Sequence, residues 1–412
     1  MGHPLEQISL HRRTVLKQAV VGSALVGVSA PFAAGRAAAP VAVKQYKQLG
    51  STDIQLSDIS FGGSRLHDEV TLIQHAYGRG INYFDTAESY TSGVSEETIG
   101  KALAGKRHQV YLASKGAFSA ETRQDDMMRT LEGSLQRLRT DYIDVYFNHA
   151  VNDVERLRNP EFYAFTERAK QQGKIRYIGL SGHGGRLIEC LDYAIDSGRF
   201  DVMLVAYNFG QDPSFMQRFT RSFDFIAVNP ELPRVLRKAK TAGMGVIAMK
   251  TLRGARLHSM APYQRDGATF AQAAFRWVLS NRDVDALVIT MHSPAQVDEF
   301  VAASGSVKVT RHDMELLQRY VAVHDATYCR PNCATCESSC PAHVQIADVL
   351  RHKMYFADYG AEEMARQGYT TLAHNASACL TCAHQACLHA CPYGLPVPEL
   401  TRQAHRLLSW HT

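Results

Sequence analysis

The sequence predicts an α/β protein in which a (β/α)8 barrel is followed by a small, mainly α-helical, cysteine-rich domain. Short apolar runs alternate with longer amphipathic stretches eight times between Val43 and Gly305, which matches the size and pattern of such a barrel. Eight of the nine cysteines fall within residues 329–412. Hydrophobic residues make up 45% and charged residues 21% of the 412 residues, a composition that excludes wholesale disorder, collagen and coiled coil.

The N-terminal residues 1–39 have the features of an export signal. Arg12, Arg13 and Lys17 precede a weakly apolar stretch from Ala19 to Ala30, and small residues follow. A basic start, a short apolar segment and a small-residue exit describe a secretory signal. The adjacent arginines resemble the twin-arginine signals of bacterial export, which implies a periplasmic protein that uses the twin-arginine export machinery. An uncleaved membrane anchor is the alternative, although the apolar stretch is shorter than the ~18 residues of a typical span.

The net charge of +5 says little about partners. Residues 1–39 contain four basic residues and one acidic residue, a net of +3, so the remainder carries only +2. A nucleic-acid partner, which would need a strongly basic surface, is therefore not expected. No other apolar run approaches the length of a membrane span, so we expect none in the mature chain.

The middle of the chain contains eight expected strands. They are residues 58–62, 81–86, 109–114, 143–148, 175–181, 201–208, 245–250 and 286–291. Helical patterns lie between them, such as Asp125–Leu138, and Pro160, Pro230 and Pro294 each open one, where a missing backbone N–H costs least. A doubly wound open sheet is the alternative, but such a sheet usually carries a glycine-rich fingerprint after its first strand, and this chain does not.

Four polar residues lie at or just beyond the ends of three consecutive expected strands. Asp85 lies at the end of the second strand and Tyr90 follows it, while Lys115 follows the third and His149 the fourth. In a barrel these strand ends meet at one rim, where functional groups sit. A tyrosine with an ordinary pKa of ~10 is a weak proton donor at neutral pH, and a nearby lysine cation lowers that pKa. Asp85 would hold the lysine, and His149 could hydrogen-bond a carbonyl oxygen, so the group could protonate an oxyanion while hydride arrives.

This constellation resembles the aldo-keto reductase family over essentially all of 43–305. The resemblance implies that Asp85, Tyr90, Lys115 and His149 are the catalytic tetrad, with Tyr90 as general acid. The segment Tyr46–Gly50 is similar to the family's N-terminal hairpin. The implied activity is the interconversion of a small-molecule carbonyl and alcohol by an oxidoreductase. For any one of these residues alone, a structural role is the better interpretation, and the prediction depends on all four together.

The same resemblance implies a nicotinamide cofactor, NADP or NAD. The residues that match the family's cofactor contacts are Ser181, Tyr207, Asn208, Lys250, Arg253 and Gln296. Gly182 stands where the family has an asparagine, so of that pair only Ser181 carries over. Tyr207 could stack on the nicotinamide, and packing in the core is its alternative role.

The C-terminal cysteines form two closely spaced groups. The first is Cys329, Cys333, Cys336 and Cys340, and the second is Cys379, Cys382, Cys387 and Cys391; each ends in Cys-Pro. Thiolates two to four residues apart can surround one inorganic core, and the fourth cysteine of such a run commonly ligates the partner cluster. The spacing therefore favours two [4Fe–4S] clusters with crossed ligands, in which Cys391 joins the first three cysteines and Cys340 joins Cys379, Cys382 and Cys387.

The expected helices 346–355 and 362–367 make this part similar to a two-cluster ferredoxin domain. Zinc and disulfides are the alternatives, although structural zinc sites usually pair two separated Cys-x2-Cys units. Cys190 lies on an amphipathic helical pattern and is expected to be a buried core thiol. The predicted domains are thus the signal (1–39), the barrel (43–305), a connecting helix (306–328) and the cluster domain (329–412).

The whole chain is therefore expected to be an exported iron–sulfur oxidoreductase. Its clusters would pass electrons to or from a redox partner protein. Export and clusters support each other, because the twin-arginine route carries folded, cofactor-loaded proteins. The alternative is an electron-transfer or interaction protein whose barrel is a non-catalytic scaffold.

Overall fold

The computed structural model describes residues 41–183, 186–211, 231–252, 260–265, 268–324, 329, 334–357, 362–392 and 394–409. The predicted signal, residues 1–39, lies outside these ranges. Across these ranges, no helix combines the length and the apolar character that crossing a membrane requires.

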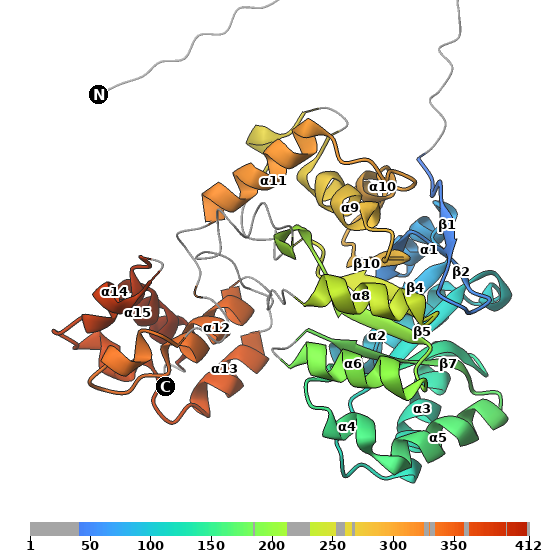
Figure 1. The fold of residues 1–412 in the computed structure, drawn as a ribbon, viewed down its shortest axis with the longest axis horizontal. Coiled ribbons are helices and arrows are strands. Elements are labelled where there is room, and N and C mark those ends of the chain that lie inside the picture. Colours follow the sequence, from blue (N-terminus) through green and yellow to red (C-terminus); the bar gives the residue numbers. More distant parts are fainter. Residues whose placement is uncertain are drawn as a thin grey trace, which may run out of the picture. The chain divides into compact units, whose positions relative to one another are not determined.

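Eight parallel strands close into a barrel in the order β10–β3–β4–β5–β6–β7–β8–β9. Figure 1 shows this part of the chain with helices around the strands. Their bounds are β3 (Ile59–Gly62), β4 (Tyr83–Asp85), β5 (Tyr111–Gly116), β6 (Ile143–Asn148), β7 (Ile175–Gly182), β8 (Val202–Ala206), β9 (Gly245–Met249) and β10 (Ala286–Thr290). Each strand matches the predicted run to within two residues at either end, and the predicted (β/α)8 barrel is confirmed. Closure leaves no sheet edge, so all eight carboxyl ends of the strands meet at one rim.

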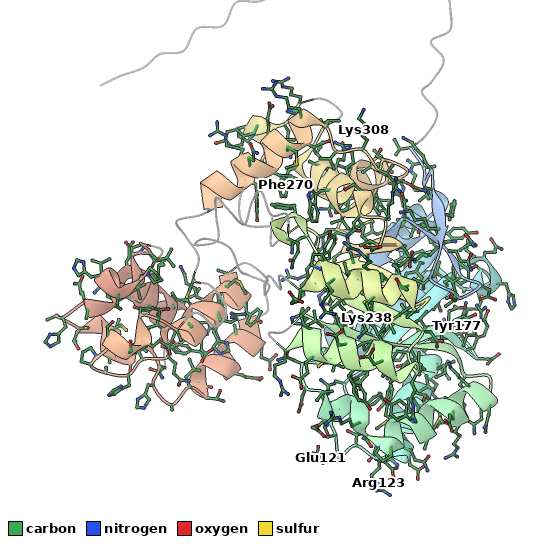
Figure 2. All side chains as sticks on the ribbon, in the orientation of Figure 1. Glu121, Arg123, Tyr177, Lys238, Phe270 and Lys308 are labelled. Carbon is green, nitrogen blue, oxygen red and sulfur yellow. The ribbon has the colours of Figure 1, made fainter. Side chains whose placement is uncertain are left out.

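Helices surround the strands and bury their apolar faces against them. They are α1 (Val70–Gly78), α2 (Val94–Ala102), α3 (Gln124–Leu138), α4 (Glu155–Arg158), α5 (Pro160–Gln171), α6 (Leu187–Ser197), α8 (Leu232–Thr241), α9 (Phe270–Ser280) and α10 (Pro294–Val301). Pro160 and Pro294 open α5 and α10 as predicted, whereas Pro230 lies outside the described residues and α8 begins at Leu232. Charged side chains such as Glu121, Arg123 and Lys308 line the outer surface (Figure 2). Cys190 of α6 is fully buried, as expected of a core thiol.

An antiparallel hairpin, β1 (Tyr46–Gln48) and β2 (Gln55–Ser57), contributes to the barrel interior. Its residues Leu49, Ile54 and Leu56 are buried in one cluster with strand residues such as Phe147 and Ile247. Gly50 at its turn has φ of 55°, and a Cβ there would lie 2.3 Å from the Gly245 backbone nitrogen at the start of β9. The hairpin therefore covers the amino ends of the strands, and the rim at their carboxyl ends lies on the opposite side of the barrel.

A further helix, α11 (Arg311–His324), packs on α9. Phe270 of α9 stacks on Tyr320 of α11 with ring centroids 4.4 Å apart. Arg276 and the buried Asp313 form a two-pronged ion pair at 2.5 and 3.1 Å. A buried pair of this geometry holds the two helices in one register.

Among its described residues, the cysteine-rich part contains four α-helices with a core of their own. They are α12 (Ile346–Ala357), α13 (Glu362–Thr370), α14 (Ala386–Ala390) and α15 (Val397–Leu408). The first two match the helices expected at 346–355 and 362–367. Val344, Val349, Ala404 and Leu408 are buried together in this core.

Candidate active site

The four predicted catalytic residues lie on neighbouring strand ends. Asp85 ends β4, Lys115 is the penultimate residue of β5, and His149 directly follows β6. These three strands are consecutive in the barrel, with Asp85 paired to Ala113 and Lys115 to Phe147. Tyr90 opens a 3-10 turn, Tyr90–Gly93, that follows β4. The structure thus brings all four residues to the same rim.

A buried ion pair lies at the centre of this group. Lys115 Nζ lies 2.6 Å from Asp85 Oδ1 and donates a second hydrogen bond to Thr86 O at 2.5 Å. The two side chains are almost fully buried, and burial by itself lowers the pKa of Lys115. The interactions of Lys115 with Asp85, and then with Tyr90, outweigh that effect and raise the lysine pKa above its ordinary value. Lys115 is therefore a fixed cation.

Tyr90 lies against this cation and against His149. Lys115 Nζ is 4.8 Å from the centre of the Tyr90 ring, and the His149 ring meets the phenol edge-on at 5.5 Å between centroids. Burial raises the pKa of Tyr90, the Lys115 charge lowers it, and the net pKa is raised. The expectation that Lys115 lowers this pKa is therefore right for the direct contact but wrong for the sum, because desolvation of the phenolate is the larger effect. Tyr90 is a protonated phenol held beside a cation.

His149 is a neutral imidazole. Burial, followed by the charges of Lys115, His183, Arg156 and Lys250, lowers its pKa to about 3. A neutral ring has one N–H to donate and one nitrogen to accept. It can therefore hydrogen-bond a carbonyl oxygen without carrying a charge into the site.

The predicted cofactor residues are divided between two environments. Ser181, Asn208, Lys250 and Gln296 follow or end strands β7 to β10 at the same rim as the tetrad. Ser181 is buried, and its Oγ accepts a hydrogen bond from Ala150 N at 3.0 Å. Gln296 Oε1 accepts from His292 N at 2.7 Å, at the start of α10. Arg253 lies outside the described residues.

Tyr207 has the packing role instead. Its ring lies 5.2 Å from that of Trp277 on α9, and its hydroxyl accepts a hydrogen bond from Asn281 Nδ2 at 2.9 Å. It belongs to the buried layer between helices and strands. These contacts support the packing role, and the stacking of Tyr207 on a nicotinamide stays a prediction.

The comparison with protein families agrees with this geometry. The model of the aldo/keto reductase family matches residues 58–322. The chain belongs to the aldo/keto reductase family. It is accordingly an oxidoreductase of aldo/keto reductase type, and its cysteine groups lie beyond the matched region.

Two curated proteins show the range of similarity to this aldo/keto reductase. L-galactose dehydrogenase of Arabidopsis thaliana is 26% identical over 313 residues, which are 68% of this chain and 94% of that protein. Methylglyoxal reductase of Escherichia coli is 34% identical over 131 residues, 32% of this chain and 42% of that protein. Among solved structures, an aldo/keto reductase of Klebsiella pneumoniae in complex with NADP and acetate has a TM-score of 0.52. It is 25% identical and covers 68% of this chain and 96% of its own.

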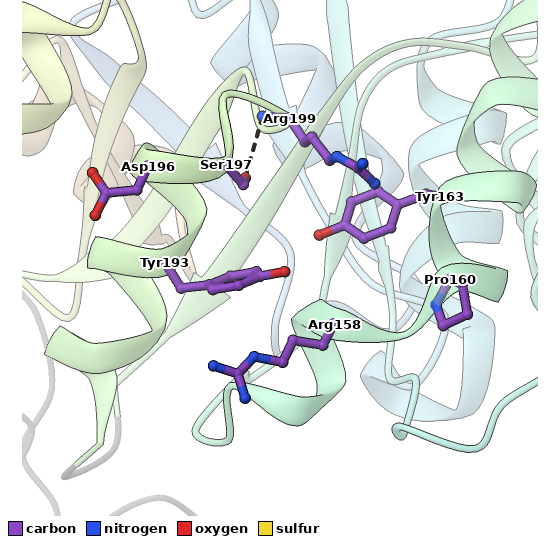
Figure 3. Close-up of a pocket in the computed structure, with 7 residues that line it drawn as sticks. All are labelled: Arg158, Pro160, Tyr163, Tyr193, Asp196, Ser197 and Arg199. Carbon is purple, nitrogen blue, oxygen red and sulfur yellow. Dashed lines mark hydrogen bonds between the residues drawn. The ribbon is translucent and has the colours of Figure 1, made fainter.

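A surface pocket of this aldo/keto reductase lies away from the tetrad. Figure 3 shows its lining residues on α4 to α6 and the segments beside them: Arg158, Pro160, Tyr163, Tyr193, Asp196, Ser197 and Arg199. The Arg199 guanidinium lies 4.2 Å from the centre of the Tyr163 ring. None of the predicted catalytic or cofactor residues lines this pocket, so we do not identify it with the site of the reaction.

The described cysteines of the C-terminal part form two neighbourhoods. Cys340, Cys379, Cys382 and Cys387 line one cavity, together with Thr401. Burial, followed by the nearby thiols of Cys329, Cys391 and Cys387, raises the pKa of the Cys336 thiol to about 12. Cys333 lies outside the described residues. Among the residues that the structure describes, no three His, Cys, Asp or Glu side chains are grouped so as to hold a single metal ion.

Two residues of the rim escaped the sequence analysis. His183 follows β7, and the strand-end rule that found His149 could have found it as well. Arg156 lies in α4 and contacts the segment that carries His149. The sequence gives no comparable signal for Arg156, because an arginine among charged residues of a helix has the pattern of an ordinary surface residue.

The neutral histidines make stability depend on pH. His149 and His183 both have their pKa lowered to about 3, mainly by burial, whereas an unfolded histidine titrates near 6.5. The unfolded chain therefore binds more protons as the pH falls below 6.5, and the folded state loses stability. Each histidine should cost roughly 2 kcal/mol of unfolding free energy between pH 6.5 and pH 5. Urea unfolding at pH 7 and pH 5 measures this, and His149→Gln should reduce the pH difference by about that amount. An equal pH difference in both proteins would contradict the assignment.

Proposed function

We propose that this chain is a nicotinamide-dependent reductase that interconverts a small-molecule carbonyl and an alcohol, with Tyr90 as general acid. The observation that carries the proposal is the buried Lys115–Asp85 pair directly beneath Tyr90 and beside His149. NADP is the preferred cofactor, because the related Klebsiella enzyme was solved with it. The residues that would hold it are Ser181 near the end of β7, Lys250 directly after β9 and Gln296 in α10, the helix that follows β10.

The rim residues fit such a ligand. Lys250 adopts φ of 56°, a strained conformation for a residue with a Cβ, directly at the end of β9. Strain of this kind tends to be retained at functional sites. Burial lowers the Lys250 pKa to about 8, so it is largely a cation at pH 7 and can meet a phosphate oxygen.

The chain's own residues handle the proton. A bound dihydronicotinamide supplies the hydride to the carbonyl carbon. As charge develops on the carbonyl oxygen, the Tyr90 hydroxyl donates its proton to that oxygen. The phenolate that remains is stabilised by Lys115, which Asp85 holds in place. The N–H of neutral His149 can donate to the same oxygen and orient it.

Replacing Tyr90 by phenylalanine tests this role. The ring and its packing remain while the proton donor is lost, so we expect turnover of a carbonyl panel with NADPH to fall by roughly 10²- to 10⁴-fold. Affinity for NADPH, measured by fluorescence titration, should stay near that of the wild type. Tyr177→Phe is the matched control, because that hydroxyl bonds Asp53, far along β7 from the rim. Unchanged turnover in Tyr90→Phe would remove Tyr90 as the acid.

One observation favours a second candidate function, a barrel that serves as a scaffold for electron transfer or interaction. Gly182 offers no side-chain amide, so one of the family's usual cofactor contacts is missing, and Tyr207 packs against Trp277 of α9. In that case the wild-type protein would neither bind nor oxidise NADPH. The same titration distinguishes the two functions.

The cysteine-rich part is proposed to hold two [4Fe–4S] clusters and to exchange electrons with a redox partner protein. Four cysteines line one cavity in the combination that crosses Cys340 with the second group. Cys391 in turn is a neighbour of Cys336 from the first group. The cavity supports one of the crossed ligand sets that the spacing predicts. The other set stays a prediction, because Cys333 lies outside the described residues and Cys387 is also near Cys336. When bound, clusters supply one-electron transfer, and the thiols and the surrounding apolar core set their potential.

Metal and sulfide analysis tests the clusters. Protein purified without oxygen should contain about eight iron and eight sulfide per chain, and Cys382→Ser should lose about half of each. Cys190→Ser is the control, because that thiol is buried in the barrel layer. Stoichiometric zinc, or loss of free thiols with no iron, would identify one of the alternatives instead.

Export through the twin-arginine route is proposed for the whole chain. The support is the sequence of residues 1–39 together with the cysteine groups, which would need to be loaded before export. Changing Arg12 and Arg13 to lysine should retain the protein in the cytoplasm, measured by fractionation and immunoblotting. A single-lysine variant is the graded control. Undiminished periplasmic protein in the double variant would contradict this route.

A further inference from the structure

His149 is carried by a short segment beyond the end of a strand. β6 ends at Asn148, and Ala150, the residue after His149, has φ of 52°. This left-handed conformation costs a residue with a Cβ roughly 1–2 kcal/mol. Such a conformation persists only where the surrounding structure over-determines it. The position of the imidazole therefore depends on the bonds that residues 148–151 receive.

Arg156 supplies three of these bonds from one side. Its Nη1 donates to Ala150 O at 2.9 Å, and its Nη2 donates to His149 O at 2.8 Å and to Asn148 Oδ1 at 2.9 Å. Its Nε donates to Phe118 O at 2.6 Å, in the segment that follows β5. The Arg156 guanidinium thus links the segment that follows β5 to the segment that carries His149.

Ser181 fastens the segment from the other side. Its Oγ accepts a hydrogen bond from Ala150 N at 3.0 Å, and its carbonyl oxygen accepts one from Val151 N at 2.7 Å. Ser181 is buried near the end of β7, so it is a rigid anchor. The segment is held between β7 and Arg156.

The Arg156 guanidinium is hydrogen-bonded to neutral oxygen atoms. Within the described residues no carboxylate forms an ion pair with it, and its hydrogen bonds go to three carbonyl oxygens and one amide oxygen. The planar guanidinium presents several donors in a fixed fork, which a lysine ammonium does not reproduce. The positive charge therefore faces the His149 segment without being neutralised there.

We propose that Arg156 is a positioning residue for His149. It fixes the imidazole over the rim beside Tyr90, where its N–H can orient a carbonyl oxygen, and it does so through a fork of hydrogen bonds that only an arginine can make. This inference rests on the proposed function for its catalytic meaning. The fixing of His149 itself is a structural statement that can be tested without turnover.

The experiment compares Arg156→Met and Arg156→Lys with the wild type. Both variants lose the fork, and the lysine variant keeps the charge. The rate at which diethylpyrocarbonate modifies His149 is measured by peptide mass spectrometry, with His183 on the next strand end as internal reference. In Arg156→Met the ratio of the His149 rate to the His183 rate should rise by roughly tenfold, because the segment opens more often when its charged donor is lost. Arg156→Lys should show a smaller rise.

Arg176→Met is the matched control. Arg176 is half-buried and also bonds a buried partner, Asp144 Oδ1, at 2.7 Å, but it lies at the amino end of β7. The Arg176→Met variant should have a lower free energy of unfolding in urea, while diethylpyrocarbonate should modify its His149 at the wild-type rate. Equal reactivity of His149 in Arg156→Met and the wild type would overturn the proposal. An equal rise in Arg156→Met and Arg176→Met would overturn it as well, because the effect would then be general loosening.

Turnover supplies the second readout. Where the wild type reduces a carbonyl with NADPH, Arg156→Met should lower kcat on the order of 100-fold, the usual cost of displacing a catalytic group by about 1 Å. The KM for NADPH should change little, because the hydrogen bonds of Arg156 go to the end of β6 and to the segments that follow β5 and β6, and to none of the residues proposed to hold NADPH. A kcat in Arg156→Met that equals the wild-type value, with His149 mobile, would show that His149 needs no fixing. A wild type without turnover would count against the proposed function, and the His149 reactivity would still decide the role of Arg156.

Discussion

The ion pair between Lys115 and Asp85 is the interaction on which the rest of the site depends. Two charges taken out of water cost several kcal/mol each, and only short, well-oriented contacts offset that cost. Here the contact is 2.6 Å, and Thr86 O accepts a second bond from the same ammonium. Such geometry requires two side chains from neighbouring strands, since Asp85 ends β4 and Lys115 lies near the end of β5. The closed barrel provides this, because its strand register fixes both backbones.

The pair also sets the electrostatics around it. Lys115 keeps a positive charge in a buried position, and this charge pushes the pKa of His149 down while it favours the phenolate of Tyr90. Lys250 and Arg156 add further positive charge at the rim. A site with several fixed cations and a neutral imidazole is suited to a developing oxyanion and to phosphate groups. Burial is the main reason why His149 and His183 stay neutral, and these charges add to it.

The two halves of the chain use different means to place reactive groups. The barrel uses strand register, so residues from β4, β5 and β6 converge although they are far apart in sequence. The cysteine-rich part uses short spacings within a small helical core, in which Val349, Ala404 and Leu408 are buried. Close spacing along the chain limits how four thiols can be arranged. The fold, in turn, brings Cys340 to the cavity that Cys379, Cys382 and Cys387 line.

The amino-acid sequence by itself determined the barrel, the position of its strands to within two residues, and the placement of Asp85, Tyr90, Lys115 and His149 at strand ends. It could do so because strand periodicity is local and because the ends of parallel strands in a barrel meet at one rim. Only the tertiary structure decided the rest. Whether Tyr207 faces a ligand or α9 depends on its neighbour Trp277, and the pKa of Tyr90 depends on the balance of burial against the Lys115 charge. Arg156 became visible through four hydrogen bonds to segments that follow two different strands. Burial, side-chain direction and long-range hydrogen bonds are properties of the packed chain, and no local pattern encodes them.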